Sequence, residues 1–416
     1  MSKEIMNPVQ IIEHHFEQAA ARLHLDSTMR DYLRAISREL SFTLILENGK
    51  LYHGYLVQHD CTLGLYKGGT RFFPEVNLDE FRGLGKGMTW KNSFHGLPLG
   101  GMKGGVDCDP KTLTRKELKE ICEKFIDETF HLIGPEMAVL GPDAGVTAEM
   151  MGWMMKRYSL LSGVPNIWGA VTGKPTELHG SYGRKDATGT GGAVVILEVL
   201  KKLGINVKDC RIIAEGFGNV NIPAVKILYK NGAKIIGLSD SHGAIFQENG
   251  FEGIDIERAI ELKESGKKPL AELETGKVIT HDELFAMPCD VWISAAVGTT
   301  ITAQRAKSMN AQVLAELGNI CATVEADEIF RGKKIVVLPD TMASGGGVNV
   351  SWYEMVQNRQ WEQWPEKVVL AKLQKHMKEI FEYGWQYSQE KGLYLRDAVF
   401  DLAVKRVVDA RRCTVC

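Results

Sequence analysis

The stretch from residue 211 to residue 240 decides the fold. It reads RIIAEGFGNVNIPAVKILYKNGAKIIGLSD. A short apolar run is followed by Gly216-Phe-Gly218, by a helical stretch up to Lys230, and by a second apolar run. This order of strand, glycine turn, helix and strand predicts a βαβ unit with parallel strands. Similar apolar runs at 291–295, 313–314 and 335–338 alternate with helical stretches, so the sequence predicts an α/β fold with a parallel sheet.

The glycine turn indicates a site for a dinucleotide. Gly216-x-Gly218-x-x-Asn221 matches the phosphate-binding fingerprint except at its third position, where Gly or Ala is usual. The first glycine permits the tight turn, and the second lets a pyrophosphate approach the helix N-terminus. Asp240 ends the second strand at roughly the distance at which an acid binds the ribose hydroxyls.

The sequence leaves the choice between NAD and NADP open. Asp240 favours NAD because its charge would repel a 2′-phosphate. Ser239, Ser241 and His242, however, could offer that phosphate hydrogen bonds.

Composition narrows the class of protein. The chain has 416 residues, of which 44% are hydrophobic and 25% charged, and this composition excludes a wholly disordered chain. The formal net charge of −2 disfavours nucleic acid as a partner. No apolar run approaches the length of a membrane span, so no membrane partner is expected. The eight cysteines are scattered, apart from Cys413 and Cys416 in the tail, which favours reduced thiols in a cytoplasmic protein. His14-His15 lacks a partner at metal-ligand spacing, and no metal is expected.

The rest of the chain suggests a second, mixed α/β domain before the parallel sheet. Asn7-Pro8 predicts a helix start, and Asn48-Gly49 between apolar arms at 42–46 and 51–57 predicts a β-hairpin. After Pro365 the pattern is helical almost to the end. We expect one domain over residues 1–185 and a dinucleotide-binding domain over 186–389, with a C-terminal helix at about 390–416 that packs back on the first.

Three lysines lie in glycine-rich stretches of the first domain. They are Lys67 in KGGTR, Lys91 in MTWK, and Lys103 in GGMKGG, and we expect these stretches to be loops. A small dianionic substrate needs cations, and a lysine crowded by other cations in a dry pocket has a lowered pKa and can serve as a base. Alternatively, the lysines are solvated loop charges.

Asp143 follows an uncharged stretch, Met137–Gly141, and precedes Ala144-Gly145. A desolvated carboxyl is held partly protonated and can shuttle protons. Alternatively, Asp143 stabilises a turn or caps a helix ahead of Thr147.

Taken together, these motifs resemble the glutamate dehydrogenases of the Glu/Leu/Phe/Val dehydrogenase superfamily. The similarity runs from the hairpin near Phe42 to the end of the chain. The matching segments are Lys67–Phe72, Met88–Lys91, Leu99–Gly105, Val171–Pro175, Gly183–Arg184 with Ala187–Gly189, Gly216–Val220, and Val348–Asn358 with Ser351.

The resemblance implies NAD(P)-dependent, reversible oxidative deamination of L-glutamate to 2-oxoglutarate and ammonia, with hydride transfer from Cα to the nicotinamide. It implies two domains separated by a cleft, usually assembled as a hexamer, here a homohexamer. By resemblance, Lys103 activates the water that attacks the imine, Asp143 shuttles protons, and Lys91 holds the α-carboxylate. Lys67 and Ser351, on opposite sides of the expected domain boundary, hold the γ-carboxylate, with Gly68 and Val348 beside the substrate. The implied cofactor residues are Thr188, Gly216, Gly218, Asn219, Val220, Asp240 and Asn319.

Several positions depart from the family pattern at loops that face ligands. Gly141 replaces alanine and could enlarge the pocket, and Asn221 stands where the third fingerprint glycine is usual. His179 and Ser344 also differ. These departures keep two alternatives open, which are the same chemistry on another amino acid and a non-catalytic regulatory homologue. The presence of both Lys103 and Asp143 argues against the second.

Overall fold

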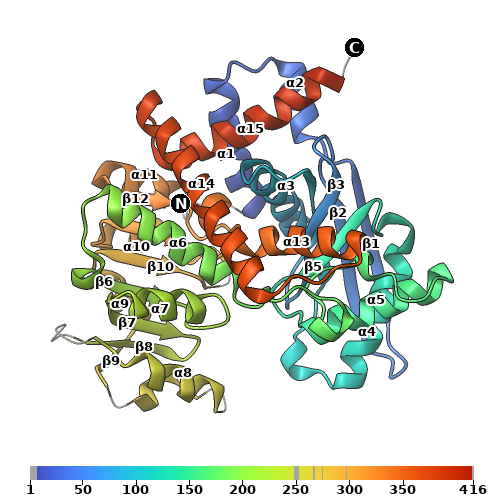
Figure 1. Ribbon diagram of the computed structural model, residues 1–416, viewed down its shortest axis with the longest axis horizontal. Helices are drawn as coiled ribbons and strands as arrows, with labels where there is room; N and C mark the ends of the chain where they lie inside the picture. The colour runs from blue at the N-terminus through green and yellow to red at the C-terminus, as the bar shows by residue number, and fades with distance from the viewer. Residues whose placement is uncertain (1–6, 248–252, 266–267, 274, 297, 415–416) are drawn as a thin grey trace, which may run out of the picture. The chain divides into compact units, whose positions relative to one another are not determined.

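The computed structural model describes residues 7–247, 253–265, 268–273, 275–296 and 298–414, so Cys416 lies outside it. The chain forms two compact units (Figure 1). The N-terminal unit comprises residues 7–184, 348–371 and 400–414, and the middle unit comprises residues 185–347 and 372–399. Each unit has its own sheet flanked by helices, which confirms the predicted two-domain α/β class.

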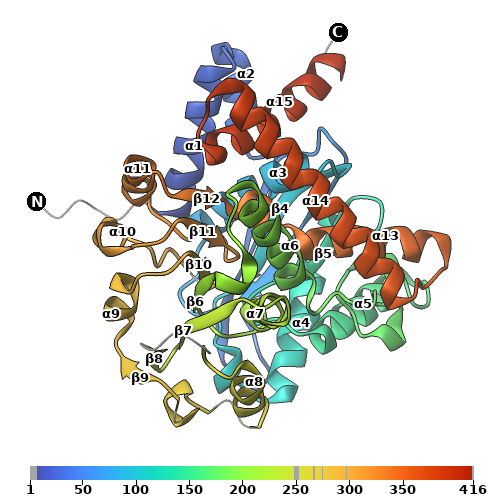
Figure 2. The same ribbon diagram turned by 60° about the vertical axis from the view of Figure 1, so that its left-hand side comes forward.

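The middle unit is built on a seven-stranded sheet in the order β12-β11-β10-β6-β7-β8-β9 (Figure 2). Its first five strands in this order are parallel, as predicted, and β8 pairs antiparallel with both β7 and the edge strand β9. The strands are β6 (Arg211–Glu215), β7 (Lys234–Asp240), β8 (Gly243–Phe246), β9 (Lys277–Ile279), β10 (Val291–Ser294), β11 (Val313–Glu316) and β12 (Val336–Leu338). The helices are α6 (Ala187–Lys202), α7 (Asn221–Lys230), α8 (Ile256–Glu264), α9 (His281–Ala286), α10 (Ala303–Ser308), α11 (Val324–Lys333) and α12 (Asp340–Ala343).

The N-terminal unit has a five-stranded mixed sheet in the order β1-β2-β4-β3-β5. The predicted hairpin is its antiparallel β1–β2 pair, and β3 lies parallel to both β4 and β5. The strands are β1 (Arg38–Ile45), β2 (Leu51–Gln58), β3 (Leu65–Phe72), β4 (Leu99–Val106) and β5 (Ala138–Pro142). The helices are α1 (Pro8–Arg22), α2 (Ser27–Arg34), α3 (Leu78–Phe94), α4 (Arg115–Thr129), α5 (Ala148–Ser162) and α13 (Gly346–Gln360). Asn7 caps α1 as expected.

The lysine stretches expected as loops are regular elements instead. Lys67 lies in β3, Lys103 in β4 and Lys91 in α3. The glycines allow close packing of backbone on backbone, because a Cβ added at Gly68 would lie 1.6 Å from the carbonyl oxygen of Met102. A Cβ at Gly105 would lie 1.8 Å from the carbonyl oxygen of Arg71. The glycines beside Lys67 and Lys103 therefore indicate tight strand packing as well as proximity to a ligand.

After residue 365 the chain is helical, as expected, in two long helices, α14 (Glu366–Lys391) and α15 (Leu395–Thr414), which are separated near Gly392. The end of α15 joins the N-terminal unit, where the Arg406 guanidinium donates to the carbonyl oxygens of Ser93 and Leu97 at 2.8 and 3.1 Å. Residues 348–371 also group with the N-terminal unit. The expected boundaries had assigned them to the dinucleotide-binding domain, and the difference arises because α13 bonds to the segment 171–184.

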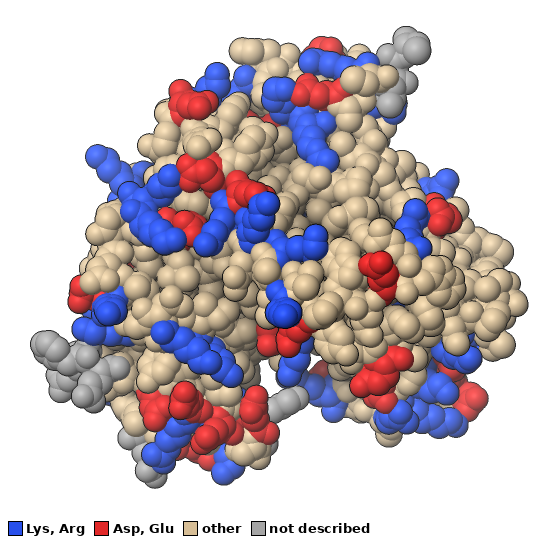
Figure 3. All heavy atoms as spheres, in the orientation of Figure 1, with Lys and Arg blue, Asp and Glu red and all other residues tan. Residues whose placement is uncertain are grey.

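No helix in the described ranges is long and apolar enough to cross a membrane. Basic and acidic side chains are interspersed on the face shown in Figure 3, as the small net charge suggests.

A buried ion network in the middle unit generates a stability prediction. Arg396 of α15 makes two bonds of 2.9 Å to Glu316 and one of 2.8 Å to Asp327, all three side chains being buried. Arg396→Met leaves two buried carboxylates unpaired, so we expect a loss of about 3–5 kcal/mol. The thermal unfolding midpoint should fall by about 10 °C. The exposed Arg258→Met is the matched control, and a midpoint equal to that of the control would refute the prediction.

Candidate active site

Lys103, Asp143 and Arg71 form a charged cluster within the N-terminal unit. The Lys103 Nζ lies 2.9 Å from Asp143 Oδ2, and the Arg71 Nε donates to the same oxygen at 2.8 Å. Arg71 also donates to Glu80 at 2.6 Å. The three parts come together because β3 lies between β4 and β5, and Asp143 directly follows β5.

The charges around Asp143 favour its ionised form, against the expectation of a partly protonated carboxyl. Burial would raise its pKa, but Arg71 and Lys103 outweigh that effect and hold the pKa well below its usual range. The helix-capping alternative is also wrong, since the side chain of Thr147 caps α5. For Lys103, burial lowers the pKa, with Arg71 and Lys91 acting in the same direction and Asp143 against it.

The three lysines are buried, so the alternative of solvated loop charges is wrong. Lys67, Lys91 and Lys103 are 2%, 6% and 3% exposed. Burial, followed by the charge of Arg184, lowers the pKa of Lys67 to about 7, while Glu354 opposes the change.

Lys67 and Arg184 are cations with no carboxylate partner among the described residues. The Lys67 ammonium lies beside Gly141, where an added Cβ would be 2.8 Å from Nζ and 3.1 Å from Thr172 Oγ1. The partly buried Arg184 donates from Nε to Ser351 Oγ at 3.0 Å. A buried charge without a counter-ion is costly, so this part of the unit is prepared for an anionic ligand.

Sequence reasoning missed four charged members of this arrangement. Arg71, Lys174, Arg184 and Glu354 all lie in segments that were matched to the family, but they received no role. Charged residues inside otherwise apolar or glycine-rich motifs were the available signal. Their partners are distant in sequence, as with Lys174 and Glu354, and only the folded chain shows the pairs.

In the middle unit the fingerprint adopts the strand–turn–helix geometry that a dinucleotide requires. Gly216 has φ +82°, and a Cβ at Gly218 would meet no atom within 4 Å, so the backbone there is open to a ligand. Asn219 and Val220 complete the turn, and α7 begins at Asn221 with no side-chain cap on its first amides. An uncapped helix N-terminus suits a pyrophosphate.

Asn221 does not disturb this turn. Its side chain is fully buried, and Nδ2 donates to the carbonyl oxygen of Glu215 at 2.6 Å, which ties the start of α7 to the end of β6.

Asp240 is engaged by other groups of the middle unit. One oxygen accepts from the backbone N–H of His242 at 2.8 Å, and the other accepts from the Lys263 ammonium and from the N–H of Leu270. Burial would raise the pKa of Asp240, but Lys263 and the backbone donors lower it. The acid is therefore a charged, paired group.

The other expected site residues divide between the units. Ser351 and Val348 lie on α13 and Gly68 on β3 in the N-terminal unit, while Thr188 lies in the first turn of α6 and Asn319 follows β11 in the middle unit. Of the departures, His179 has φ +58° and stacks on Trp168 at a ring-centroid distance of 3.5 Å. Ser344 donates to the carbonyl oxygen of Asp340 at 2.8 Å.

Comparison with known proteins agrees with this arrangement. The family model described as Glutamate/Leucine/Phenylalanine/Valine dehydrogenase matches residues 180–414, and the model of the Glu/Leu/Phe/Val dehydrogenase dimerisation domain matches residues 37–160. The chain belongs to the Glu/Leu/Phe/Val dehydrogenase family. The resemblance inferred from the sequence is thereby confirmed, and the chain is an amino acid dehydrogenase.

Named relatives cover nearly the whole chain. It is 37% identical over 402 residues to a glutamate dehydrogenase of Thermotoga maritima, with 95% of each chain covered. It is 34% identical to a catabolic NAD-specific glutamate dehydrogenase of Bacillus subtilis, with 99% of this chain and 96% of the relative covered. Among solved structures, the hetero-hexameric glutamate dehydrogenase of Thermus thermophilus in its Leu-bound form is similar, with a TM-score of 0.91, 29% identity and 98% of each chain covered.

Proposed function

We propose that this enzyme catalyses the reversible, nicotinamide-dinucleotide-dependent oxidative deamination of L-glutamate to 2-oxoglutarate and ammonia. One observation carries the choice of a dicarboxylic substrate, namely the pair of cations, Lys67 and Arg184, that lack a carboxylate partner in the described part of the chain. The glutamate dehydrogenases among its relatives support the same conclusion.

The distal carboxylate of glutamate is assigned to Lys67, Arg184 and Ser351. A carboxylate there would give both cations a counter-charge, and an apolar side chain would leave the buried Lys67 ammonium unpaired. The α-carboxylate is assigned to Lys91, which is buried on α3, with Gly68 and Val348 lining the substrate.

The chemical steps are assigned to Lys103 and Asp143. A bound nicotinamide supplies the acceptor for the Cα hydride. Lys103, whose pKa is lowered, then takes a proton from the water that adds to the resulting imine. Asp143 starts as a carboxylate, so it accepts the proton of the substrate amine and returns one to the departing ammonia.

Substitution of Lys103 or Asp143 tests these roles. Lys103→Met and Asp143→Asn should each reduce kcat by about 10²–10⁴-fold, because neither new side chain transfers a proton. Because each change breaks the ion pair between Lys103 and Asp143, the thermal unfolding midpoint is measured on both proteins and kcat is compared at a temperature at which both are folded. The exposed Lys111→Met serves as the control for loss of a positive charge. Turnover of Lys103→Met at the wild-type rate would remove Lys103 from the mechanism.

Substrate choice tests the proposed function itself. We expect wild type to prefer glutamate over leucine and 2-aminoadipate in kcat/KM. The double change Lys67→Leu with Ser351→Val should reduce kcat/KM for glutamate at least about a hundredfold, because the distal carboxylate of glutamate would be buried without its ammonium partner. The same double change should allow leucine to react. Preference of the wild-type enzyme for leucine would show that Lys67 does not bind a distal carboxylate, and would favour the same chemistry on another amino acid.

We propose NAD as the cofactor, bound along Gly216, Gly218, Asn219, Val220 and Asp240 in the middle unit. Thr188 and Asn319 are assigned to the nicotinamide end. The NAD-specific relatives support this choice. Because Lys263 neutralises much of the charge of Asp240, we propose that it weakens the rejection of NADP.

The cofactor proposal predicts a change in preference without a change in reaction. Lys263→Met frees the charge of Asp240, so the ratio of kcat/KM with NAD to kcat/KM with NADP should rise about tenfold, equivalent to roughly 1.4 kcal/mol. Lys268→Met removes an ammonium that pairs instead with Glu272 and should leave the ratio unchanged. An unaltered ratio in Lys263→Met would mean that Asp240 does not face the 2′ position.

We also propose a homohexamer located in the cytoplasm. The match to a dimerisation-domain model and the hexameric Thermus thermophilus neighbour support assembly. The free thiols of the described cysteines suit a reducing compartment.

A further inference from the structure

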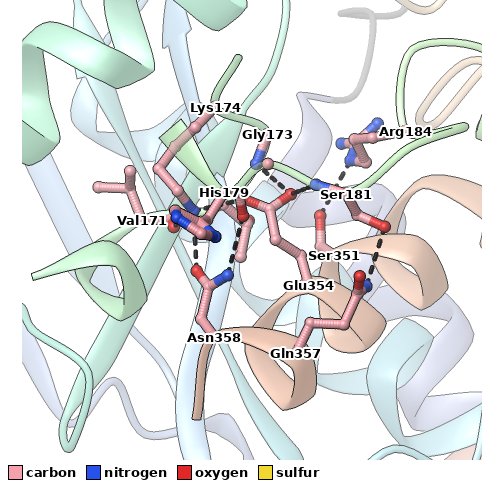
Figure 4. Close-up of polar contacts among 12 residues, drawn as sticks. Val171, Gly173, Lys174, His179, Ser181, Arg184, Ser351, Glu354, Gln357 and Asn358 are labelled. Carbon is pink, nitrogen blue, oxygen red and sulfur yellow. Dashed lines mark hydrogen bonds and ion pairs between the residues drawn. The ribbon is translucent and has the colours of Figure 1, made fainter. Parts of the chain in front are cut away.

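Helix α13 presents a line of polar side chains to the segment 171–184 within the N-terminal unit (Figure 4). Ser351, Glu354 and Asn358 are spaced by three and four residues, so they lie on one face of the helix. The central member, Glu354, has a side chain with no exposed surface. A buried carboxylate is costly unless its oxygens are fully paired.

Glu354 meets that condition by binding the backbone and one lysine of the segment. Oε1 accepts from the Lys174 ammonium at 2.5 Å, and Oε2 accepts from the N–H of Gly173 at 2.9 Å and of Ser181 at 3.2 Å. Both ends of the loop 173–181 are thus held by one carboxyl group.

Neighbouring bonds complete the attachment. Lys174 also donates to Asn358 Oδ1 at 2.9 Å, and Asn358 Nδ2 donates to the carbonyl oxygen of His179 at 2.8 Å. Just beyond the attached loop, Arg184 reaches Ser351, one turn before Glu354 on the same helix. The position of Arg184 therefore depends on the loop that Glu354 holds.

Glu354 also acts on Lys67 through its charge. Burial lowers the pKa of Lys67, the cations Arg184, Lys174 and Lys103 add to that effect, and Glu354 is the carboxylate that opposes it. Burial likewise lowers the pKa of Arg184, with Glu354 and Asp143 opposing. These charges come from β3, β4, α13 and the segment 171–184, all within one unit.

We propose that Glu354 is a positioning residue whose buried carboxylate holds the segment 173–184 on α13 and, through its negative charge, favours the ammonium form of Lys67 that binds the distal carboxylate of the substrate. The proposal rests on the proposed function, in which Lys67 and Arg184 bind that carboxylate. Because Glu354 and Lys174 carry opposite charges, they shift the pKa of Lys67 in opposite directions.

Those opposite effects define the experiment. Glutarate and valerate are compared as competitive inhibitors, because they differ only by the distal carboxylate. Titration of Lys103 or Asp143 affects both inhibitors equally and therefore cancels in the ratio of their Ki values. In the wild-type enzyme the advantage of glutarate should be present at low pH and be lost as the pH rises through the pKa of Lys67. Above the pKa of Lys67, a shift of this pH profile by one pH unit changes the ratio of the two Ki values about tenfold.

Glu354→Gln removes the supporting negative charge, so the loss should move to lower pH. Lys174→Met removes an opposing positive charge and leaves Glu354 its two backbone donors, so the loss should move to higher pH. Glu177→Gln removes an exposed carboxylate from the same segment and should leave the profile unchanged. Thermal unfolding is measured on every variant.

Shifts in opposite directions support the proposal. Shifts in the same direction, or weaker glutarate binding with an unmoved profile in both variants, would overturn it and leave the ion pair a purely structural role. If Glu354→Gln does not fold, Lys174→Met decides alone, since an unmoved profile there refutes the electrostatic role. Equal wild-type affinities for glutarate and valerate at every pH would instead refute the proposed function, because Lys67 would not bind a distal carboxylate.

Discussion

The burial of several cations in one small part of the N-terminal unit is the constraint on which the site depends. Burial removes most of the hydration of Lys67, Lys103 and Arg71. Burial disfavours the charged form of a side chain unless a carboxylate lies beside it. The fold supplies three carboxylates at fixed places: Asp143 pairs with Lys103 and Arg71, Glu80 pairs with Arg71, and Glu354 pairs with Lys174. What remains is a positive excess at Lys67 and Arg184. A dicarboxylic substrate relieves that excess, so binding and specificity follow from the same electrostatic imbalance.

Close strand packing makes this imbalance possible. In β3 and β4 one lysine is followed by two glycines, and a Cβ added at Gly68 or Gly105 would lie 1.6 or 1.8 Å from a neighbouring carbonyl oxygen. The sheet can therefore bury an ammonium on a strand without a bulky neighbour beside it. The charges of Lys103, Asp143 and their neighbours then influence the protonation of Lys103 and Asp143. Asp143 is driven toward its ionised form by the cations that flank it, while burial drives Lys103 toward neutrality. A base with a lowered pKa beside an ionised carboxyl group can take part in proton transfer.

Most of the fold could be predicted from the sequence because its signals are local. The βαβ unit at 211–240, the hairpin at 42–57 and the cap at Asn7 each depend on residues within a few positions of one another, and the structure confirms them. The lysine stretches were misread as loops because glycine is equally suited to a turn and to close strand packing. The protonation of Asp143 was misread because its partner Arg71 is distant in sequence and approaches only when β3 and β5 pair. Arg184 and Glu354 received no role for the same reason.

Gly141 illustrates how a departure from the family pattern acquires a different meaning in the folded chain. By sequence alone, alanine replaced by glycine suggests an enlarged pocket and a bulkier substrate. In the structure, the space that a Cβ would occupy is bounded by the Lys67 ammonium at 2.8 Å and by Thr172 Oγ1 at 3.1 Å. A methyl group at this position would crowd the Lys67 ammonium. Its absence therefore leaves space for the ammonium beside β5 and adds little room for a ligand. Since this ammonium has no carboxylate partner among the described residues, the departure preserves the demand for an anionic side chain such as that of glutamate.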